Sequence, residues 1–229
     1  MIVSSAKICG LVRPEDAACA HAAGARFVGA VFAGGPRRVD AAQARAVYDA
    51  APGCTRVAVM GHEPVEDLVS RAMQAGADIV QLHGDPSPRT VEAVREAWPG
   101  GVWAVLRVPA DAFDRERAAA LFDVADGVVL DAFVPGALGG TGVALDWRQL
   151  VGPLTDVRAR ASSLAALVVA GGLRPDTVAT AIRLLAPDVV DVSSGVERMP
   201  GVKDHDRVRA FVAATRGDEE QLVLLGETA

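Results

Sequence analysis

The chain has 229 residues, of which 51% are hydrophobic, and a formal net charge of −6. One α/β domain can fill this length, since an α/β barrel takes about 200–250 residues as a single unit. No cluster of lysine and arginine offers a nucleic-acid footprint, and no run approaches the ~20 apolar residues of a membrane span. With no signal-peptide pattern at the start either, we expect a cytoplasmic protein that binds neither nucleic acid nor membrane.

The three cysteines, Cys9, Cys19 and Cys54, show no CxxC spacing. An odd number without that spacing argues against a disulfide framework and against a zinc site. We therefore expect no metal and no cofactor. Cys19 and Cys54 are expected to be structural, because neither lies at the end of a predicted strand.

Short β-branched runs alternate with alanine-rich amphipathic segments along the whole chain. Each predicted strand is followed by a predicted helix. In chain order the strand and helix pairs are 3–9 and 14–23, 27–32 and 41–50, 56–60 and 64–75, 78–82 and 87–98, 102–108 and 112–122, 127–131 and 147–151, 164–170 and 175–185, and 189–193 and 206–214.

This alternation predicts parallel strands joined by right-handed crossovers. Eight such units favour a closed (β/α)₈ TIM barrel over residues 1–216, in the α/β class. An open doubly wound sheet would need a GxGxxG loop after its first strand, and residues 10–13 read Gly-Leu-Val-Arg. The polar stretch 153–163 leaves the sixth helix poorly defined. The tail 217–229 is expected to be a docking segment, a frayed end or an oligomer contact.

The active site of such a barrel lies at the carboxyl ends of its strands. Polar side chains or glycines follow the first, fourth, sixth, seventh and eighth predicted strands. The pairs Gly171–Gly172 and Ser193–Ser194, with Gly195, suggest a phosphate site, because glycine lets backbone N–H groups approach an anion. Ordinary turn formation is the alternative explanation for these glycines.

Six segments become specific when they are taken together. In order they are KICGLVRPEDA, GPRRV, DIVQLHGD, LDAFVPGALGGTG, VVAGGLRPDTV and VDVSSGVERMPGVKD. Over residues 2–216 the chain resembles the phosphoribosylanthranilate isomerase family of tryptophan biosynthesis. The resemblance implies an Amadori rearrangement of N-(5′-phosphoribosyl)anthranilate, a small phosphorylated substrate, to 1-(2-carboxyphenylamino)-1-deoxyribulose 5-phosphate.

The resemblance also implies that Cys9 is the general base and Asp131 the general acid. Each role sets a condition, because cysteine must act as a thiolate and aspartate must carry a proton. Without the resemblance, Cys9 would more often be a small buried apolar residue.

Further substrate contacts follow from the same resemblance. Arg37 matches the residue that holds the anthranilate carboxylate, and a planar guanidinium suits that group. Gln81 and His83 alternate on one strand, so both can face the barrel interior near the ribose, although His83 is equally well explained as a structural histidine. Lys7 shares a face with Cys9, and we expect it to form a structural pair with Asp191 across strands one and eight.

Several positions depart from the family pattern. The chain has Gly34–Gly35 before the Pro-Arg dipeptide, and Gly61 and His62 where the family usually has asparagine. The alternatives are a related ribose-phosphate aldose–ketose isomerase, which Cys9 disfavours because those barrels use aspartate there, and a catalytically silent phosphosugar-binding barrel. The oligomeric state is left open between a monomer and a homodimer.

Overall fold

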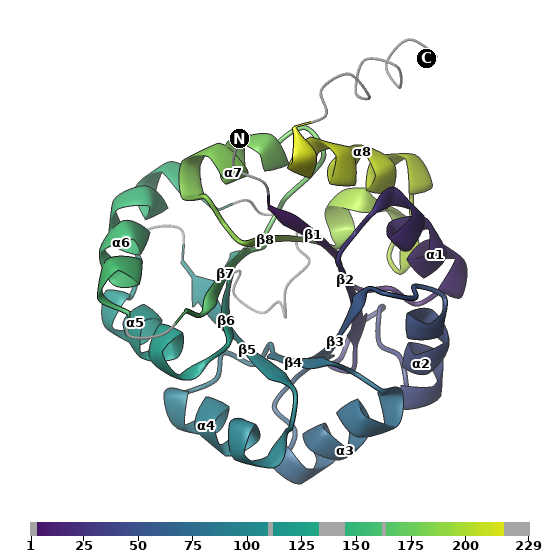
Figure 1. Ribbon diagram of the computed structural model, residues 1–229, viewed down its shortest axis with the longest axis horizontal. Coiled ribbons are helices and arrows are strands. Elements are labelled where there is room, and N and C mark those ends of the chain that lie inside the picture. Colours follow the sequence, from purple (N-terminus) through teal and green to yellow (C-terminus); the bar gives the residue numbers. More distant parts are fainter. Residues whose placement is uncertain (1–3, 110–111, 133–144, 162–163, 218–229) are drawn as a thin grey trace.

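The computed structural model describes residues 4–109, 112–132, 145–161 and 164–217. Parallel strands close into a barrel in sequential order, and long helices surround it (Figure 1). The strands are β1 (Ser5–Ile8), β2 (Phe27–Val31), β3 (Thr55–Met60), β4 (Ile79–Leu82), β5 (Gly101–Val108), β6 (Gly127–Ala132), β7 (Ala166–Val169) and β8 (Val189–Val192). The helices are α1 (Pro14–Ala23), α2 (Ala41–Asp49), α3 (Val65–Ala75), α4 (Pro88–Ala97), α5 (Arg115–Val124), α6 (Trp147–Arg160), α7 (Val178–Leu185) and α8 (His205–Arg216). The predicted single (β/α)₈ barrel is confirmed.

The barrel closes where β1 pairs with β8. In that register Lys7 lies opposite Asp191, and on its other side Lys7 lies opposite Phe27 of β2. Because side chains alternate along a strand, every second residue points into the barrel and the others point toward the helices. The interior apolar cluster is small and contains Cys9, Val57, Val59, Trp103, Val105, Val129, Val168, Ala170 and Val189. A much larger cluster fills the space between the strands and the helices.

Helix α6 is longer than the sequence predicted, since it continues to Arg160 with Pro153 inside it. The polar stretch 153–163 had left the end of this helix undefined. Proline also opposes a helix there, because it removes one helical hydrogen bond and crowds the preceding turn. Leu150, Leu154 and Val157 nevertheless form a buried stripe at helical spacing. Burial of this stripe outweighs the cost of the proline.

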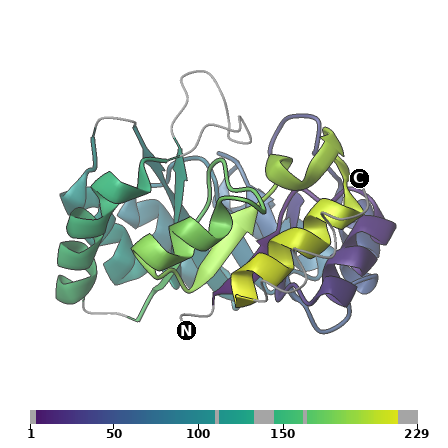
Figure 2. The same ribbon diagram turned by 90° about the horizontal axis from the view of Figure 1, so that it is seen from above.

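A short two-stranded hairpin lies between β8 and α8 and was not predicted. It follows a single 3₁₀ turn, η1 (Ser194–Val196), and consists of β9 (Glu197–Met199) and β10 (Val202–Lys203). In Figure 2 it lies above α8 at the same end of the barrel as the carboxyl ends of the strands. This position brings hairpin side chains to the predicted site.

Among the described residues, no helix is long and apolar enough to cross a membrane. Helix α8 ends at Arg216, with Gly217 as its C-cap in the left-handed conformation. The rest of the predicted tail and its apolar run 222–225 lie outside the described residues. Residues 133–144, which carry part of the sequence motif after β6, lie outside them too.

Candidate active site

The fold brings the predicted site residues to one end of the barrel, because the carboxyl ends of parallel strands meet there. Each residue lies at the end of a strand or in the loop that follows it. Cys9 follows β1, Arg37 follows β2, Gln81 and His83 lie at the end of β4, Asp131 lies near the end of β6, Gly171 and Gly172 follow β7, and Ser193, Ser194 and Gly195 follow β8.

Cys9 is buried at the mouth of the barrel interior. Gly29 on the neighbouring strand β2 leaves room for it, because a Cβ atom at position 29 would lie 2.9 Å from Cys9 Sγ. Burial raises the pKa of the Cys9 thiol, and the charge of Lys7 is the largest influence that lowers it. Burial therefore opposes formation of the Cys9 thiolate, and the charge of Lys7 favours it.

Asp131 is also buried, near the end of β6, which β7 and β8 separate from β1 around the barrel. Its Oδ2 lies 3.9 Å from His83 Nε2. Burial raises the pKa of the Asp131 carboxyl, nearby Asp191 raises it further, and His83 opposes the shift. The direction is the one that an aspartic acid needs to hold a proton near neutral pH.

Arg37 is already held by a partner that the sequence did not reveal. Its Nε and Nη2 donate to the two carboxylate oxygens of Glu197, at 2.8 and 2.6 Å. The buried Lys203 also donates to Glu197, at 2.8 Å, and to the backbone oxygen of Ser193, at 3.1 Å. We call Arg37, Glu197 and Lys203 the hairpin triad. With two positive charges and one negative charge, the triad has a net positive charge, which favours binding of an anion beside it.

Position 37 lies next to the loop that follows β8. A Cβ atom at Gly10 would lie 2.6 Å from Arg37 Cδ and 2.8 Å from Ser193 Oγ. Glycine fits at position 10 because it has no side chain to meet these atoms. It also adopts the observed φ of 69° without strain. The anthranilate site and the phosphate site predicted from the sequence are thus adjacent in space.

Inside the barrel the predicted pairing of Lys7 with Asp191 is confirmed, with Lys7 Nζ 2.8 Å from Asp191 Oδ2. Gln81 is buried as well, and its Oε1 has no hydrogen-bond partner among the described residues. A buried acceptor without a partner is costly, so it points toward a ligand that donates to it. This agrees with the predicted position of Gln81 near the ribose.

The two glycine loops support an anion site through their backbone. Gly171 and Gly172 both have left-handed φ values, of 74° and 70°. A Cβ at Gly171 would lie 2.8 Å from the backbone nitrogen of Ala132 and 3.1 Å from Asp131 Oδ1. A Cβ at Gly195 would lie 2.0 Å from the carbonyl oxygen of Leu173, so close packing between the loops already requires that glycine.

No long helix begins directly at either loop. Helix α7 was expected to begin at residue 175 and begins at Val178, because Arg174 and Thr177 form a turn in which Arg174 N donates to Thr177 Oγ1. After β8 comes only the single turn η1. Any phosphate held here depends on backbone N–H groups and serine hydroxyls more than on helix dipoles.

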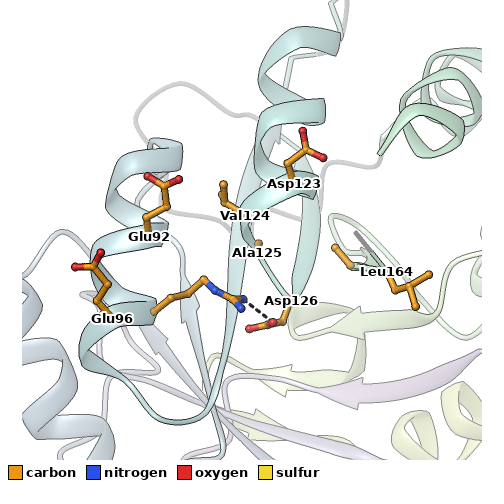
Figure 3. A pocket seen from close by; sticks show the side chains of 9 residues that line it. Glu92, Glu96, Asp123, Val124, Ala125, Asp126 and Leu164 are labelled. Carbon is orange, nitrogen blue, oxygen red and sulfur yellow. Dashed lines mark hydrogen bonds and ion pairs between the residues drawn. The ribbon is translucent and has the colours of Figure 1, made fainter. Parts of the chain in front are cut away.

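A large hollow of about 790 Å³ lies at the opposite end of the barrel, beside the residues that precede β6 and β7 (Figure 3). Carboxylates of Glu92, Glu96, Asp123 and Asp126 surround it, with Arg95 paired to Asp126. This acidic lining does not suit an anionic substrate. Among the residues described, no group of three or more His, Cys, Asp or Glu side chains is arranged so that it could hold a metal ion.

Comparisons with known proteins agree with this geometry. Residues 6–214 match the family model described as N-(5′-phosphoribosyl)anthranilate isomerase. A relative of that name from Acidithiobacillus ferrooxidans is 40% identical over 92% of this chain and 97% of its own. The Thermotoga maritima isomerase structure is 32% identical, with a TM-score of 0.81 over 93% of this chain and 99% of that one.

A second solved isomerase was crystallised with a reduced form of 1-(o-carboxyphenylamino)-1-deoxyribulose 5-phosphate. It is 32% identical, with a TM-score of 0.77 over 93% of this chain and 99% of that one. The family model covers most of the chain, and the named relative exceeds 30% identity over almost all of it. The chain therefore belongs to the N-(5′-phosphoribosyl)anthranilate isomerase family.

Proposed function

We propose that Cys9 and Asp131 are the general base and general acid of this isomerase. The enzyme catalyses the Amadori rearrangement of N-(5′-phosphoribosyl)anthranilate. In the proposed mechanism Asp131 donates a proton to the furanose ring oxygen, and the ring opens to a Schiff base. The Cys9 thiolate then removes the proton from C2′. The resulting enolamine gains a proton at C1′ and loses one from the C2′ hydroxyl to give the ketose.

The observation that carries the proposal is the opposed placement of the two groups at one barrel end. Cys9 follows β1 and Asp131 lies on β6, so a ribose bound across the mouth has one group on each side. The desolvated Asp131 is suited to donate a proton first and to accept one later. The loops position the substrate, because proton transfer requires the reacting atoms to lie within hydrogen-bond distance of the acid and the base.

The two anionic ends of the substrate have separate proposed sites. The hairpin triad, through Arg37, binds the anthranilate carboxylate, since the triad keeps a net positive charge in a half-buried position. Gly171, Gly172, Ser193, Ser194 and Gly195 bind the 5′-phosphate. Gln81 and His83 contact the ribose. The complex of a related isomerase with a reduced carboxyphenylamino-deoxyribulose phosphate supports this ligand class.

We further propose that the enzyme works in the cytoplasm, without metal, cofactor or nucleic acid, as a monomer or a homodimer. A dimeric form is named for the Thermotoga maritima relative. The barrel domain is proposed to comprise 1–216, with 217–229 as a dispensable tail.

Replacement of the two groups tests the assignment directly. Cys9→Ala and Asp131→Asn are expected to fold and to lose about 10²–10⁴-fold in kcat, because each removes a positioned acid or base. Turnover is followed by the loss of anthranilate-type fluorescence, with circular dichroism as the folding control. Near-normal turnover in folded Cys9→Ala would show that another group is the base. Cys54→Ala, which removes a thiol outside the site, is the matched control and should retain activity.

A further inference from the structure

The barrel interior contains a pair of charges that the proposed mechanism does not use. Lys7 is fully buried, and Asp191 is 7% exposed. Asp191 Oδ2 accepts from Lys7, whereas Asp191 Oδ1 has no hydrogen-bond partner among the described residues. The apolar residues Val57 and Val189 line the same interior.

Stability alone does not explain such a pair. Removing two charges from water is costly, and apolar side chains of similar size often stabilise a core as well or better. The cost is greater here because one carboxylate oxygen is unsatisfied. A buried pair retained in the core at the level of the site is therefore expected to serve the chemistry.

The structure brings the end of Lys7 close to the Cys9 thiol. Cys9 directly follows β1 and is two residues after Lys7, so both side chains point inward. They meet over Gly29 of β2, where an added Cβ would lie 2.9 Å from Cys9 Sγ and 3.3 Å from Lys7 Cε. Because position 29 lacks a side chain, nothing from β2 separates the thiol from the lysine.

Several charged or titratable groups on other elements also act on Cys9. They are Asp191 on β8, Lys203 on β10, Arg37 in the loop after β2 and Tyr48 on α2. Of the cations, Lys7 has the largest effect in lowering the pKa of Cys9, and Lys203 has a smaller one. Burial alone would lower the pKa of Lys7, but the charges of Asp191 and Cys9 together raise it, so Lys7 stays protonated.

We propose that Lys7 is a positioning residue that stabilises the Cys9 thiolate, and that Asp191 holds Lys7 in place and limits how strongly it does so. The thiol proton passes to solvent at the open end of the site, and Lys7 keeps its own proton. When Cys9 later takes the C2′ proton, Lys7 and Asp191 remain as a neutral pair. This assigns the pair an electrostatic role in place of the structural role expected from the sequence.

The two members of the pair should act on Cys9 in opposite directions. Lys7→Met removes the positive charge and should make the thiolate rarer. Asp191→Asn removes the negative charge, while the amide oxygen can still accept from Lys7, and should make the thiolate more frequent. A purely structural pair would give changes of the same direction, or none.

The rate of iodoacetamide alkylation at Cys9, followed against pH by peptide mass spectrometry, measures this directly. At neutral pH we expect alkylation at Cys9 to be about tenfold slower or more in Lys7→Met, near wild type in Lys7→Arg and faster in Asp191→Asn. Cys19 in the same samples is the internal control and should react at an unchanged rate. Lys203→Met, which removes another buried cation, should slow the reaction at Cys9 less than Lys7→Met does.

Unchanged alkylation in folded Lys7→Met, or slower alkylation in both Lys7→Met and Asp191→Asn, would overturn the proposal. If Lys7→Met does not fold, the alkylation rate of Cys9 in Asp191→Asn decides: a rate faster than wild type supports the proposal, and a slower rate overturns it. The proposal rests on Cys9 as the base, but its test does not. Activity retained in Cys9→Ala would contradict the mechanism, whereas the alkylation rates report only the state of the thiol.

Discussion

The carboxyl group of the proposed acid, Asp131, is buried at a cost to the stability of the fold. Burial raises the pKa of Asp131 above its ordinary value, so the folded protein favours the protonated form. The stabilising contribution of this group is complete below the ordinary aspartate pKa and is lost as pH rises through the folded-state pKa. Asp131→Asn removes this titration while keeping the size of the side chain.

We therefore expect Asp131→Asn to gain stability relative to wild type as pH rises. The difference in free energy of unfolding should be smallest in acid and should grow above the ordinary aspartate pKa, by about 1.4 kcal/mol for each unit by which folding raises the pKa. Urea unfolding of both proteins over a pH series measures it. A difference that shrinks with rising pH would mean that ionised Asp131 stabilises the fold.

Arg37 and Arg38 are neighbours with different surroundings, which makes them a matched pair. Arg37 is half-buried against Glu197, whereas Arg38 is exposed. Arg37→Ala is expected to weaken substrate binding by about 2–5 kcal/mol, because it removes the proposed charged partner of the anthranilate carboxylate. Glu197 would still be held by Lys203, so the fold should tolerate the change.

Binding of the reduced product analogue by calorimetry gives the affinity without turnover. Arg38→Ala is the control and should bind like wild type. Equal affinities for Arg37→Ala and wild type would leave Arg37 as an anchor for the hairpin only. An increase in KM without a change in kcat would fit an Arg37 contact that is equally strong in the ground state and the transition state.

The sequence could place Cys9 and Asp131 at strand ends, and the family resemblance implied their roles, but it could not reveal the partner of Arg37. Both lie at the ends of recognisable strands, and barrel geometry then places them at one mouth. Glu197 was invisible as a partner of Arg37, because 160 residues separate them and nothing in the sequence specifies that contact. The pairing of Lys7 with Asp191 was predictable, since barrel closure makes β1 and β8 neighbours.

At the scale of the element, the β9–β10 hairpin shows why part of the site was missed. Its strands have three and two residues, too few for an alternating pattern. The Pro200–Gly201 dipeptide was the available signal, since it marks a turn, and Gly201 has a φ of 82°. The buried Asp16 of α1 anchors the hairpin by accepting from Lys203 N at 3.1 Å and lies 2.8 Å from His205 Nε2.

Helix α6 offers a test of the balance between local propensity and packing. Gly152 lies within it beside Pro153, and both residues oppose a helix. A Cβ at Gly152 would meet nothing within 4 Å, and its φ is not in the left-handed region. Gly152→Ala is therefore expected to stabilise the protein by about 0.5–1 kcal/mol, because alanine loses less backbone entropy on folding.

Gly53 is the matched control for this change. The space around it is equally open, but its φ is 85°, which an alanine adopts only with strain. Gly53→Ala should destabilise the protein by about 1 kcal/mol. Thermal unfolding of both variants gives the two signs, and destabilisation by Gly152→Ala would mean that α6 needs the flexibility of glycine there.

The whole molecule determines which distant residues meet. Alternation of strand and helix patterns was enough to predict the order of all eight units, because each unit is local. The boundaries were less certain: β1 begins at Ser5 where residue 3 was expected, and α6 extends nine residues beyond the expected end at 151. Element ends depend on packing and capping that a pattern of polar and apolar residues does not contain.

Barrel closure also couples the proposed phosphate loops to the acid. Gly171 has a left-handed backbone, and a side chain there would reach both the backbone nitrogen of Ala132 and Asp131 Oδ1. Phosphate binding energy at the 5′ end can hold the ribose in place against the proposed acid and base. Gly171→Ala is therefore expected to raise KM and to lower kcat, with about a 10²-fold loss in kcat/KM.

Inorganic phosphate separates loss of the anion site from loss of the fold. It should inhibit the wild type competitively and inhibit Gly171→Ala much less. Gly53→Ala carries a similar backbone strain at a position with open surroundings, so its phosphate inhibition should match the wild type. Unchanged phosphate inhibition in Gly171→Ala, together with a reduced kcat, would place the anion elsewhere. The substitution at position 171 would then lower kcat only by disturbing Asp131, because the added methyl group would lie 3.1 Å from the Asp131 carboxylate.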